Sequence, residues 1–306
     1  MRKMGYLYMF LSTVSFAFMA VFVKSLSPSM PSHEIAFWRS FIVSGLIVIF
    51  LFWRPAVLKP LYASSNPKSE KGIRSLIHIF TRPILLFRGI LGAIALFLYF
   101  EAISQISVSE AIMLLYTAPV FTAIFSFLFL KEPFQLSTLL FLLLAMIGVS
   151  LITKPSFQTI ETGKIYALLA AVFVAASTIT VKKAGETYSS WVIVLAFTLV
   201  STLLPLPHLI YASMTISISL LTLILAVSVT TLLGQLFMTH SFRYLDATTG
   251  SVLFLLTIVN GTILGYMFLG ESLDIYSLIG GSLIIISGVK IGLSRAKPAL
   301  ATDSGD

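Results

Sequence analysis

Four polar side chains recur on one face of a long apolar stretch, residues 219–242. Ser228, Thr231, Gln235 and Thr239 are three, four and four residues apart, so they lie along one side of a helix with 3.6 residues per turn. Hydroxyl and amide groups in such a stripe either hydrogen-bond to a neighbouring helix or line a cavity that binds a polar solute. The sequence leaves both roles open for this stripe.

Ionisable side chains inside other apolar stretches are a second group of candidates. A charge in the hydrocarbon of a membrane is costly, so each such residue needs a partner or a function. We expect Arg39 to share one layer with Glu101 and Glu110 and to pair with one of them, as a structural clamp or as part of an outer gate. Arg88 and Tyr99 point in nearly the same direction on a helix, which predicts that both face a cavity. The alternative for Arg88 is that its side chain reaches the lipid headgroups.

The residues that an enzyme needs are largely missing. Only four Asp are present, none of them in the centre of an apolar stretch, and neither an HExxH metal motif nor a GxxxxGK phosphate loop occurs. Cysteine is absent, which excludes disulfides and thiolate metal sites. The sequence therefore predicts no catalytic residue, no cofactor and no metal site.

The composition indicates a membrane protein. Hydrophobic residues make up 58% of the 306 residues and charged residues only 10%, whereas a soluble domain carries roughly 25% charged residues. The apolar runs are continuous and long enough to cross a bilayer, which favours helices over strands. The predicted spans are residues 5–24, 34–53, 84–104, 108–130, 134–153, 163–182, 191–211, 219–242, 247–269 and 273–293.

Lys and Arg are unevenly distributed between the two ends of these spans. Fifteen of the 20 lie on the side that carries both chain termini, and three lie on the opposite side. Because cytoplasmic loops retain positive charge, we expect both termini in the cytoplasm. The basic residues form no cluster with interleaved aromatic residues, which argues against a nucleic-acid partner. We expect residues 54–83 to form a mobile cytoplasmic loop and residues 294–306 to form a disordered cytoplasmic tail.

The chain contains an internal duplication. Residues 5–24 align without gaps with residues 163–182 at an offset of 158, and Phe129–Glu132 matches Phe268–Glu271 at an offset of 139. This pattern predicts an all-α membrane protein of two five-helix repeats. Because five is odd, the second repeat enters the membrane from the opposite side, and inverted repeats are typical of transporters. The predicted repeats are residues 1–153 and residues 154–293.

Two pairs of equivalent charged residues lie at the ends of spans. Glu132 and Glu271 follow the fourth span of each repeat, and we expect each carboxylate to accept hydrogen bonds from the backbone that opens the next span. Lys24 and Lys182 end the first span of each repeat, on opposite faces of the membrane. They either extend to the headgroups or act as symmetric gate residues.

Short sequence elements spread over residues 5–293 carry a family resemblance. They are Arg39, Arg88–Gly92, Glu101–Ala102, Pro119–Val120, Phe129–Glu132, Gly148–Val149 and Phe268–Glu271, with Ile258 in the second repeat where the first has Pro119. With these elements the chain resembles the drug/metabolite transporter superfamily, specifically its EamA-type ten-helix members. The resemblance implies that the first, third, fourth, sixth, eighth and ninth spans surround a central cavity.

Polar residues on those spans become candidates for the cavity lining. None of them is diagnostic by itself, and interhelical hydrogen bonding is the alternative for each. The candidates, with Arg88 and Tyr99 included, are Ser12, Ser15, Arg88, Tyr99, Tyr116, Thr117, Ser177, Thr180, Thr231, Gln235, Thr239, Thr257 and Asn260.

The repeats and the resemblance together indicate a secondary transporter that moves small organic solutes by alternating access. Amino acids, related metabolites and amphipathic compounds are the solute classes that the resemblance implies, and Arg39 and Arg88 favour a solute with a carboxylate. A membrane-embedded lipid-modifying enzyme and a solute channel or facilitator are the alternatives. The expected partners are the solute and membrane lipid, and a homodimer remains open. The expected location is the cytoplasmic (inner) membrane of a bacterium.

Overall fold

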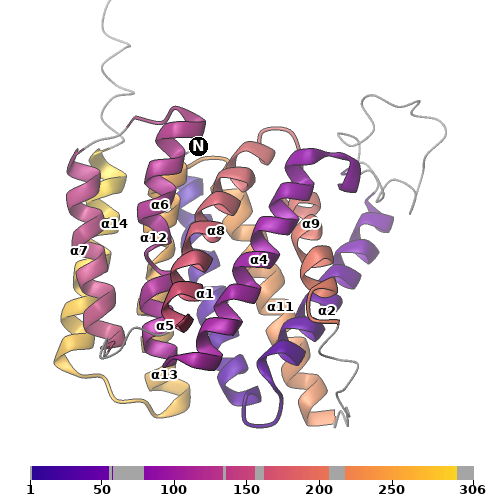
Figure 1. Cartoon of the computed structure of the whole chain (residues 1–306), viewed down its shortest axis with the longest axis horizontal. Coiled ribbons are helices and arrows are strands. Elements are labelled where there is room, and N and C mark those ends of the chain that lie inside the picture. The colour runs from indigo at the N-terminus through magenta and orange to yellow at the C-terminus, as the bar shows by residue number, and fades with distance from the viewer. Residues whose placement is uncertain are drawn as a thin grey trace, which may run out of the picture.

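The computed structural model describes residues 2–54, 57, 79–133, 136–155, 162–206 and 218–294, and in these ranges the regular structure is helical. The helices stand side by side with their axes roughly parallel (Figure 1). They are α1 (Arg2–Leu26), α2 (Ser32–Trp53), α4 (Pro83–Gln105), α5 (Val108–Leu115), α6 (Ala118–Phe125), the π-helix η2 (Ser126–Leu130), α7 (Leu136–Thr153), α8 (Thr162–Ala184), α9 (Ser190–Leu203), α11 (Ile218–Ser241), α12 (Ala247–Phe254), α13 (Leu256–Leu269) and α14 (Ile275–Ser294).

Each of the ten predicted spans corresponds to a helix or to a broken helix. Eight of them are long and apolar enough to cross a membrane, and the described parts of α7 and α9 are shorter apolar helices. The predicted fourth span consists of α5, α6 and η2, and the predicted ninth consists of α12 and α13. Most of the predicted mobile loop, apart from residues 54, 57 and 79–83, and the predicted tail, apart from residue 294, lie outside the described residues.

The two halves repeat the same packing. Gly5 and Gly163 are equivalent at the offset of 158, and both lie where one helix approaches another closely. A Cβ on Gly5 would lie 2.8 Å from Cγ of Leu245, and a Cβ on Gly163 would lie 2.9 Å from Cγ2 of Ile106. Leu245 and Ile106 are themselves equivalent at the offset of 139. In the same way, α1 packs along α11 as α8 packs along α4, so the predicted repeat is present in the fold.

Both halves break one helix at the same position. The first break lies at Tyr116 and Thr117, between α5 and α6, and the second lies at Leu255, between α12 and α13. Tyr116 and Leu255 are equivalent at the offset of 139. Pro119 accounts for the first break, because its ring leaves no N–H for a helical hydrogen bond. The second helix breaks although Ile258 replaces this proline, so proline is not required for the break.

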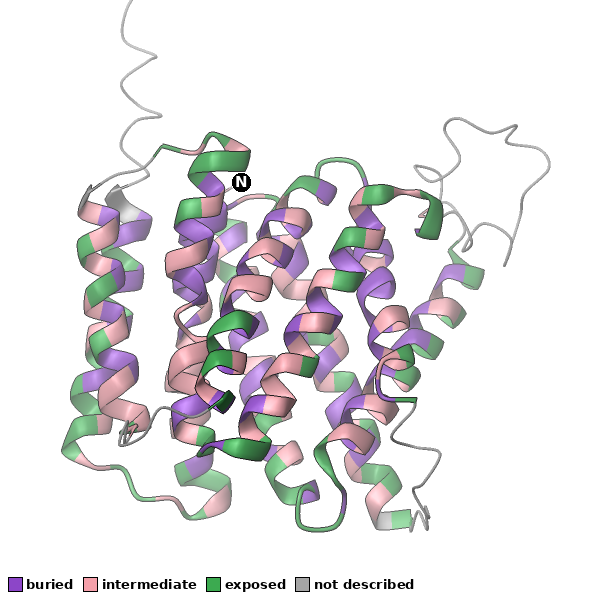
Figure 2. Cartoon of the chain, viewed as in Figure 1, coloured by how far each residue is buried: buried purple, intermediate pink, exposed green. Residues whose placement is uncertain are grey.

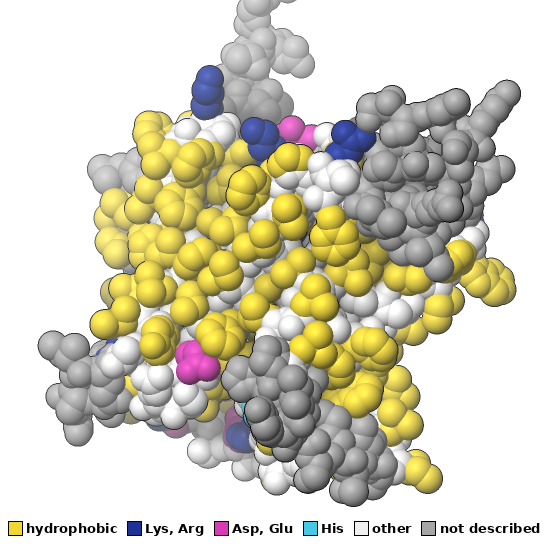
Figure 3. Space-filling model, turned by 45° about the vertical axis from the view of Figure 1, so that its right-hand side comes forward, with side chains coloured by type: hydrophobic (Ala, Val, Ile, Leu, Met, Phe, Trp, Pro, Cys, Tyr) yellow, Lys and Arg dark blue, Asp and Glu magenta, His cyan; other side chains and the backbone are white. Residues whose placement is uncertain are grey.

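The surface is apolar around the middle of the bundle and charged at its ends. Buried and exposed residues alternate around individual helices (Figure 2), and the exposed ones include many Phe, Leu and Ile side chains. In the view of Figure 3, hydrophobic side chains cover the middle of the molecule and Lys and Arg side chains gather at one end. We call the end that contains Arg2, Lys131, Lys182 and Arg243 the basic end, and we call the opposite end, which contains Lys24 and the first residues of α5 and α14, the far end.

Helices α7 and α14 approach each other through backbone at two glycines. A Cβ on Gly148 would lie 2.6 Å from the carbonyl oxygen of Gly280, and a Cβ on Gly280 would lie 2.5 Å from the carbonyl oxygen of Gly148. No real Cβ approaches a backbone oxygen so closely, so only glycine allows this spacing at either position. Interfaces of this kind stabilise helix pairs in a membrane, where packing replaces the hydrophobic effect.

An ion pair at the far end joins the same two helices. The Lys154 ammonium binds the Asp274 carboxylate, which also accepts hydrogen bonds at 2.9 and 2.8 Å from the backbone N–H and the hydroxyl of Ser277 at the start of α14. The hydrogen bond from Lys154 is the largest cause, and these interactions together lower the pKa of Asp274 from 3.8 to about 2.

The low pKa of Asp274 predicts a defined pH dependence. Because the pKa is lower in the folded chain than in the unfolded one, the carboxylate stabilises the fold above about pH 4 and loses this effect as the pH falls through about 2. Lys154→Met removes the largest cause, so the pKa of Asp274 is expected to rise toward 3.8. Carboxyl NMR of protein labelled at its four Asp, with Asp274→Asn to assign the resonance, measures the shift. An unchanged titration in Lys154→Met would contradict the assignment.

Candidate functional site

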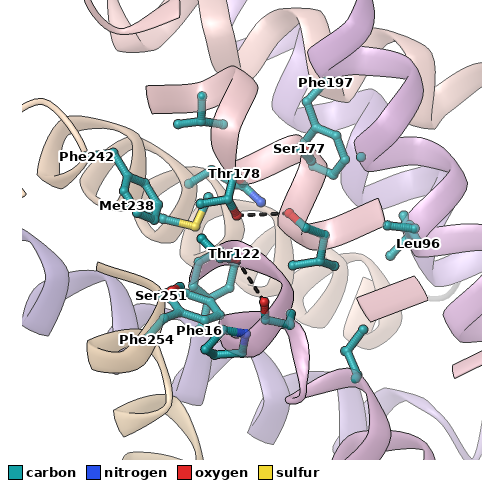
Figure 4. Close-up of a pocket in the computed structure, with 18 of the residues that line it drawn as sticks. Phe16, Leu96, Thr122, Ser177, Thr178, Phe197, Met238, Phe242, Ser251 and Phe254 are labelled. Atoms are coloured by element: carbon teal, nitrogen blue, oxygen red, sulfur yellow. Dashed lines mark hydrogen bonds between the residues drawn. The ribbon is translucent and has the colours of Figure 1, made fainter. Parts of the chain in front are cut away.

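A cavity of about 230 Å³ lies in the middle of the bundle. Residues of both halves line it, with α1, α4, α5 and α6 from the first half and α8, α9, α11 and α12 from the second. It is bordered by the first helix break, because Leu115, Tyr116, Ala118 and Pro119 all belong to its wall. Figure 4 shows Ser177 and Thr178 from α8 and Thr122 from α6 around the space, with Phe16, Phe242 and Phe254 nearby.

Arg88 supplies the charge in this cavity. Its side chain is buried in α4, and its Nη1 donates a hydrogen bond of 2.7 Å to the hydroxyl of Ser177. Its Nη2 donates one of 3.3 Å to Oε1 of Gln235, and the guanidinium lies 4.4 Å from the ring centroid of Phe197. All three partners are neutral. They hold the guanidinium plane in one orientation through hydrogen bonds and a cation–π contact.

The positive charge of Arg88 has no counter-charge among the described residues that line the cavity. These contain no Asp or Glu, and no described residue accepts a hydrogen bond from the buried Nε of Arg88. A buried charge without an opposite partner is costly, and an anion that enters the cavity would compensate it. The site therefore favours an anionic group, and a carboxylate matches the fork of a guanidinium in geometry.

The rest of the wall is mostly apolar and aromatic. Tyr99 and Tyr116 add two phenol groups, and Thr122, Thr178 and Ser251 add hydroxyls. The hydroxyls of Thr122 and Thr178 bond to carbonyls of their own helices, at Ala118 and Val174. The remaining described residues of the wall are Phe16, Gly92, Ala95, Leu96, Leu115, Ala118, Pro119, Val174, Val181, Phe197, Met238, Phe242 and Phe254. Such a wall suits a solute with an apolar body and one charged group.

The structure brings five of the predicted cavity residues together and places the other eight elsewhere. Arg88, Tyr99, Tyr116, Ser177 and Gln235 line the cavity. Ser12 donates to the carbonyl of Gly234, and Asn260 donates to Thr13, so both join helices, which was the stated alternative. Ser15, Thr117 and Thr180 donate to carbonyls of their own helices, and Thr231, Thr239 and Thr257 have buried hydroxyls with no partner among the described residues.

The predicted ion pair of Arg39 is absent from this structure. Among the described residues, Arg39 pairs with neither glutamate, and its Nη1 contacts Sδ of Met19 in α1 at 3.8 Å. Glu110 is engaged elsewhere, because it forms a capping box with Ser107 at the start of α5 and pairs with Lys164 at 3.4 Å. Glu101 lies in a separate pocket at the far end. A shared depth in the membrane was not enough to predict which of these residues pair. Pairing also depends on the direction in which each side chain points from its helix.

Three polar wall residues and the aromatic ring that contacts Arg88 were not predicted from the sequence. Thr122 lies three residues after Pro119 and shares its helical face, whereas Thr178 follows Ser177 directly and points about 100° away from it around α8. Ser251 has no comparable signal. Phe197 lies on α9, a span that the family resemblance does not place around the cavity, and only the contact with Arg88 identifies it.

Comparison with known proteins identifies the family. The profile of the EamA-like transporter family matches residues 3–154 and again residues 161–291. The pseudopaline exporter CntI of Pseudomonas aeruginosa strain UCBPP-PA14 is 33% identical over 298 residues, which cover 96% of this chain and 97% of CntI. An uncharacterized transporter of Helicobacter pylori strain 26695 is 28% identical over 92% of both chains. One solved structure has a TM-score of 0.74 at 16% identity and covers 97% of this chain and all of its own, so it shares the fold. The chain therefore belongs to the EamA-like transporter family and is a multi-pass integral membrane transporter, not an enzyme.

Proposed function

We propose that this transporter exports small organic solutes that carry a carboxylate, by alternating access to the cavity around Arg88. The observation that carries the proposal is the buried guanidinium with three neutral partners and no acidic residue in the described wall. The inverted repeat supports alternating access, because equivalent helices of the two halves can open the same cavity to opposite faces. The direction follows the name of the relative CntI, which is an exporter.

The size of the cavity and the polarity of its wall further limit the range of solutes. A cavity of about 230 Å³ suits an amino acid or a metabolite of similar size. Tyr99, Tyr116 and Phe197 provide aromatic surface for the body of the solute, and Gln235 can bond both Arg88 and a polar group of the solute. Amino acids and related metabolites therefore fit better than large amphipathic compounds.

The orientation of the chain is part of the proposal. The uneven distribution of Lys and Arg supports a cytoplasmic basic end and an external far end. The Pseudomonas and Helicobacter relatives support a bacterial cytoplasmic membrane. Cysteine labels in the loops, read with a reagent that does not cross the membrane, would report this orientation directly.

Counterflow in proteoliposomes tests the function. Vesicles with purified protein are loaded with unlabelled amino acid or metabolite, and uptake of the same radiolabelled compound is measured, with the methyl ester of each compound as the matched control. We expect saturable exchange of the free acids and at least tenfold weaker exchange of the esters. Flux that does not saturate and shows no counterflow would indicate a channel.

A further inference from the structure

Glu132 and Glu271 end equivalent helices with the same local geometry. The residue before each glutamate has a left-handed backbone, with φ of 56° at Lys131 and 67° at Gly270. The backbone N–H of Glu132 bonds the carbonyl of Ser126 at 3.3 Å, and the N–H of Glu271 bonds the carbonyl of Gly265 at the same distance. The two carboxylates are therefore presented in the same way by the two halves of the chain.

The partners of the two carboxylates differ. At the basic end, the Glu132 carboxylate accepts from the backbone N–H of Ala247, with distances of 3.0 and 3.2 Å to its two oxygens. Ala247 is the first residue of α12, so Glu132 caps a helix of the other half, a partner that the sequence did not predict. At the far end, Glu271 pairs with Lys24 of α1. The equivalent glutamates thus bind a helix N-terminus at the basic end and a lysine at the far end.

The offset of 139 identifies the donor that Glu271 lacks. Ala247 corresponds to Val108, the first residue of α5 at the far end. Val108 is 56% exposed, and its N–H has no acceptor among the described residues. The Ser107–Glu110 capping box at the start of α5 leaves the Val108 N–H as a donor for a second carboxylate, as the Ala247 N–H is the donor to Glu132 at the start of α12.

The equivalent lysines follow the same pattern. Lys182 at the end of α8 donates a hydrogen bond of 2.8 Å to the carbonyl of Leu245, beside the capped start of α12. Its counterpart Lys24 corresponds to it at the offset of 158, and the counterpart of Leu245 is Ile106, beside Val108. In this structure Lys24 forms an ion pair with Glu271 instead. The two residues that correspond to Lys182 and Glu132 are therefore bound to each other at the far end.

We propose that Glu271 and Lys24 are the gate residues of the far end, and that they exchange partners during transport. In this proposal, the hydrogen bonds of Glu132 to α12 and of Lys182 to Leu245 close the basic end in the structure described. When the cavity opens at the basic end, these bonds break, the Lys24–Glu271 pair separates, Glu271 caps α5 at Val108, and Lys24 donates to the carbonyl of Ile106. The proposal rests on alternating access, and it names the residues that carry it.

The free energies of the ion pair and of the helix cap decide how each substitution shifts the equilibrium between the state open at the far end and the state open at the basic end. The Lys24–Glu271 pair is exposed, with side-chain exposures of 60% and 41%, and exposed ion pairs contribute little. A capping carboxylate contributes more, because it satisfies a helix N–H and complements the helix dipole. Removing Glu271 therefore destabilises the state with a closed far end, in which it caps α5, more than the state with an open far end, in which it pairs with Lys24. Removing Glu132 has the opposite effect.

A single cysteine in the cavity measures both states without any transported solute. The chain has no cysteine, so the substitution Thr178→Cys introduces its single thiol. Thr178 is half-buried in the wall of the cavity. Labelling rates with a membrane-impermeant maleimide are compared from the far end, in cells, and from the basic end, in inside-out vesicles. The variants Glu132→Ala and Glu271→Ala are added to this background, with Asp274→Ala as the matched control that breaks a different ion pair of the far end.

The ratio of the far-end rate to the basic-end rate gives the result. We expect Glu132→Ala to lower it and Glu271→Ala to raise it, each about fivefold, the change expected for the loss of one helix cap. Asp274→Ala is expected to leave it unchanged. Shifts in the same direction, or no shift, would overturn the exchange of partners. Labelling from only one end in every variant would instead overturn alternating access itself, so the two failures are distinguishable.

Discussion

Arg88→Gln is expected to lower the exchange of carboxylate solutes in proteoliposomes by at least tenfold. Glutamine keeps a polar side chain toward Ser177 and Gln235 but removes the charge that is left without a counter-ion in the described wall. Loss of a charge-assisted hydrogen bond changes a binding constant by roughly tenfold or more. Binding of the labelled acid to detergent-solubilised protein, measured beside transport, separates lost affinity from lost movement.

The chemistry of the substrate is the control for this prediction. In Arg88→Gln the preference for a free acid over its methyl ester should disappear, because the ester never used the charge. Arg88→Lys should recover part of the acid transport, since an ammonium keeps the charge but lacks the planar fork that Ser177 and Gln235 hold. A variant that transports acid and ester as poorly as an unfolded protein would report misfolding, which a monodisperse gel-filtration profile excludes. A preserved acid preference in folded Arg88→Gln would show that the carboxylate binds elsewhere.

Gly148→Leu is expected to prevent correct folding, and Gly148→Ala is expected to lower the apparent melting temperature by about 5 °C or more. Even the Cβ of alanine would lie 2.6 Å from the carbonyl oxygen of Gly280, so α7 and α14 must separate. Overpacking of this kind costs roughly 1–3 kcal/mol, and larger side chains cost more. Thermal unfolding of the detergent-solubilised protein, read by gel filtration after heating, measures the change.

The matched control is Gly45→Ala. A Cβ at Gly45 would meet nothing within 4 Å, and Gly45 lies within α2, where alanine is a better helix former than glycine. Its melting temperature should therefore stay the same or rise. A similar loss in both variants would mean that glycine is required for the helix and not for the approach of α7 to α14.

The sequence predicted the helices well because their signal is strong and local. Apolar runs of membrane length have few alternative structures, and the duplication at offsets of 158 and 139 gave the inverted arrangement before any contact was known. The predicted spans begin and end within a few residues of the helices in most cases. The unpredicted break at Leu255 had no such signal, because no proline marks it.

The candidate site was harder to predict because it depends on the direction of side chains. Arg88 and Tyr99 were placed together correctly by helical periodicity, since both lie on α4. The predicted partner of Arg39 was wrong, and the contact of Glu132 with α12 was not predicted, because both contacts come from other helices and no period within one helix reports how another is rotated. Phe197 illustrates the same limit, because its ring reaches Arg88 from α9 only after the helices have packed.

The absence of an acidic residue from the described wall around Arg88 also bears on how the proposed export would be driven. If the solute crosses as a monovalent anion, it neutralises the guanidinium, and the loaded cavity carries no net charge through the membrane field. The empty cavity carries one positive charge. An inside-negative potential of 100 mV favours the outward movement of each such anion by about 2.3 kcal/mol. The membrane voltage alone could therefore drive export against a concentration gradient of roughly fiftyfold, with no coupled ion.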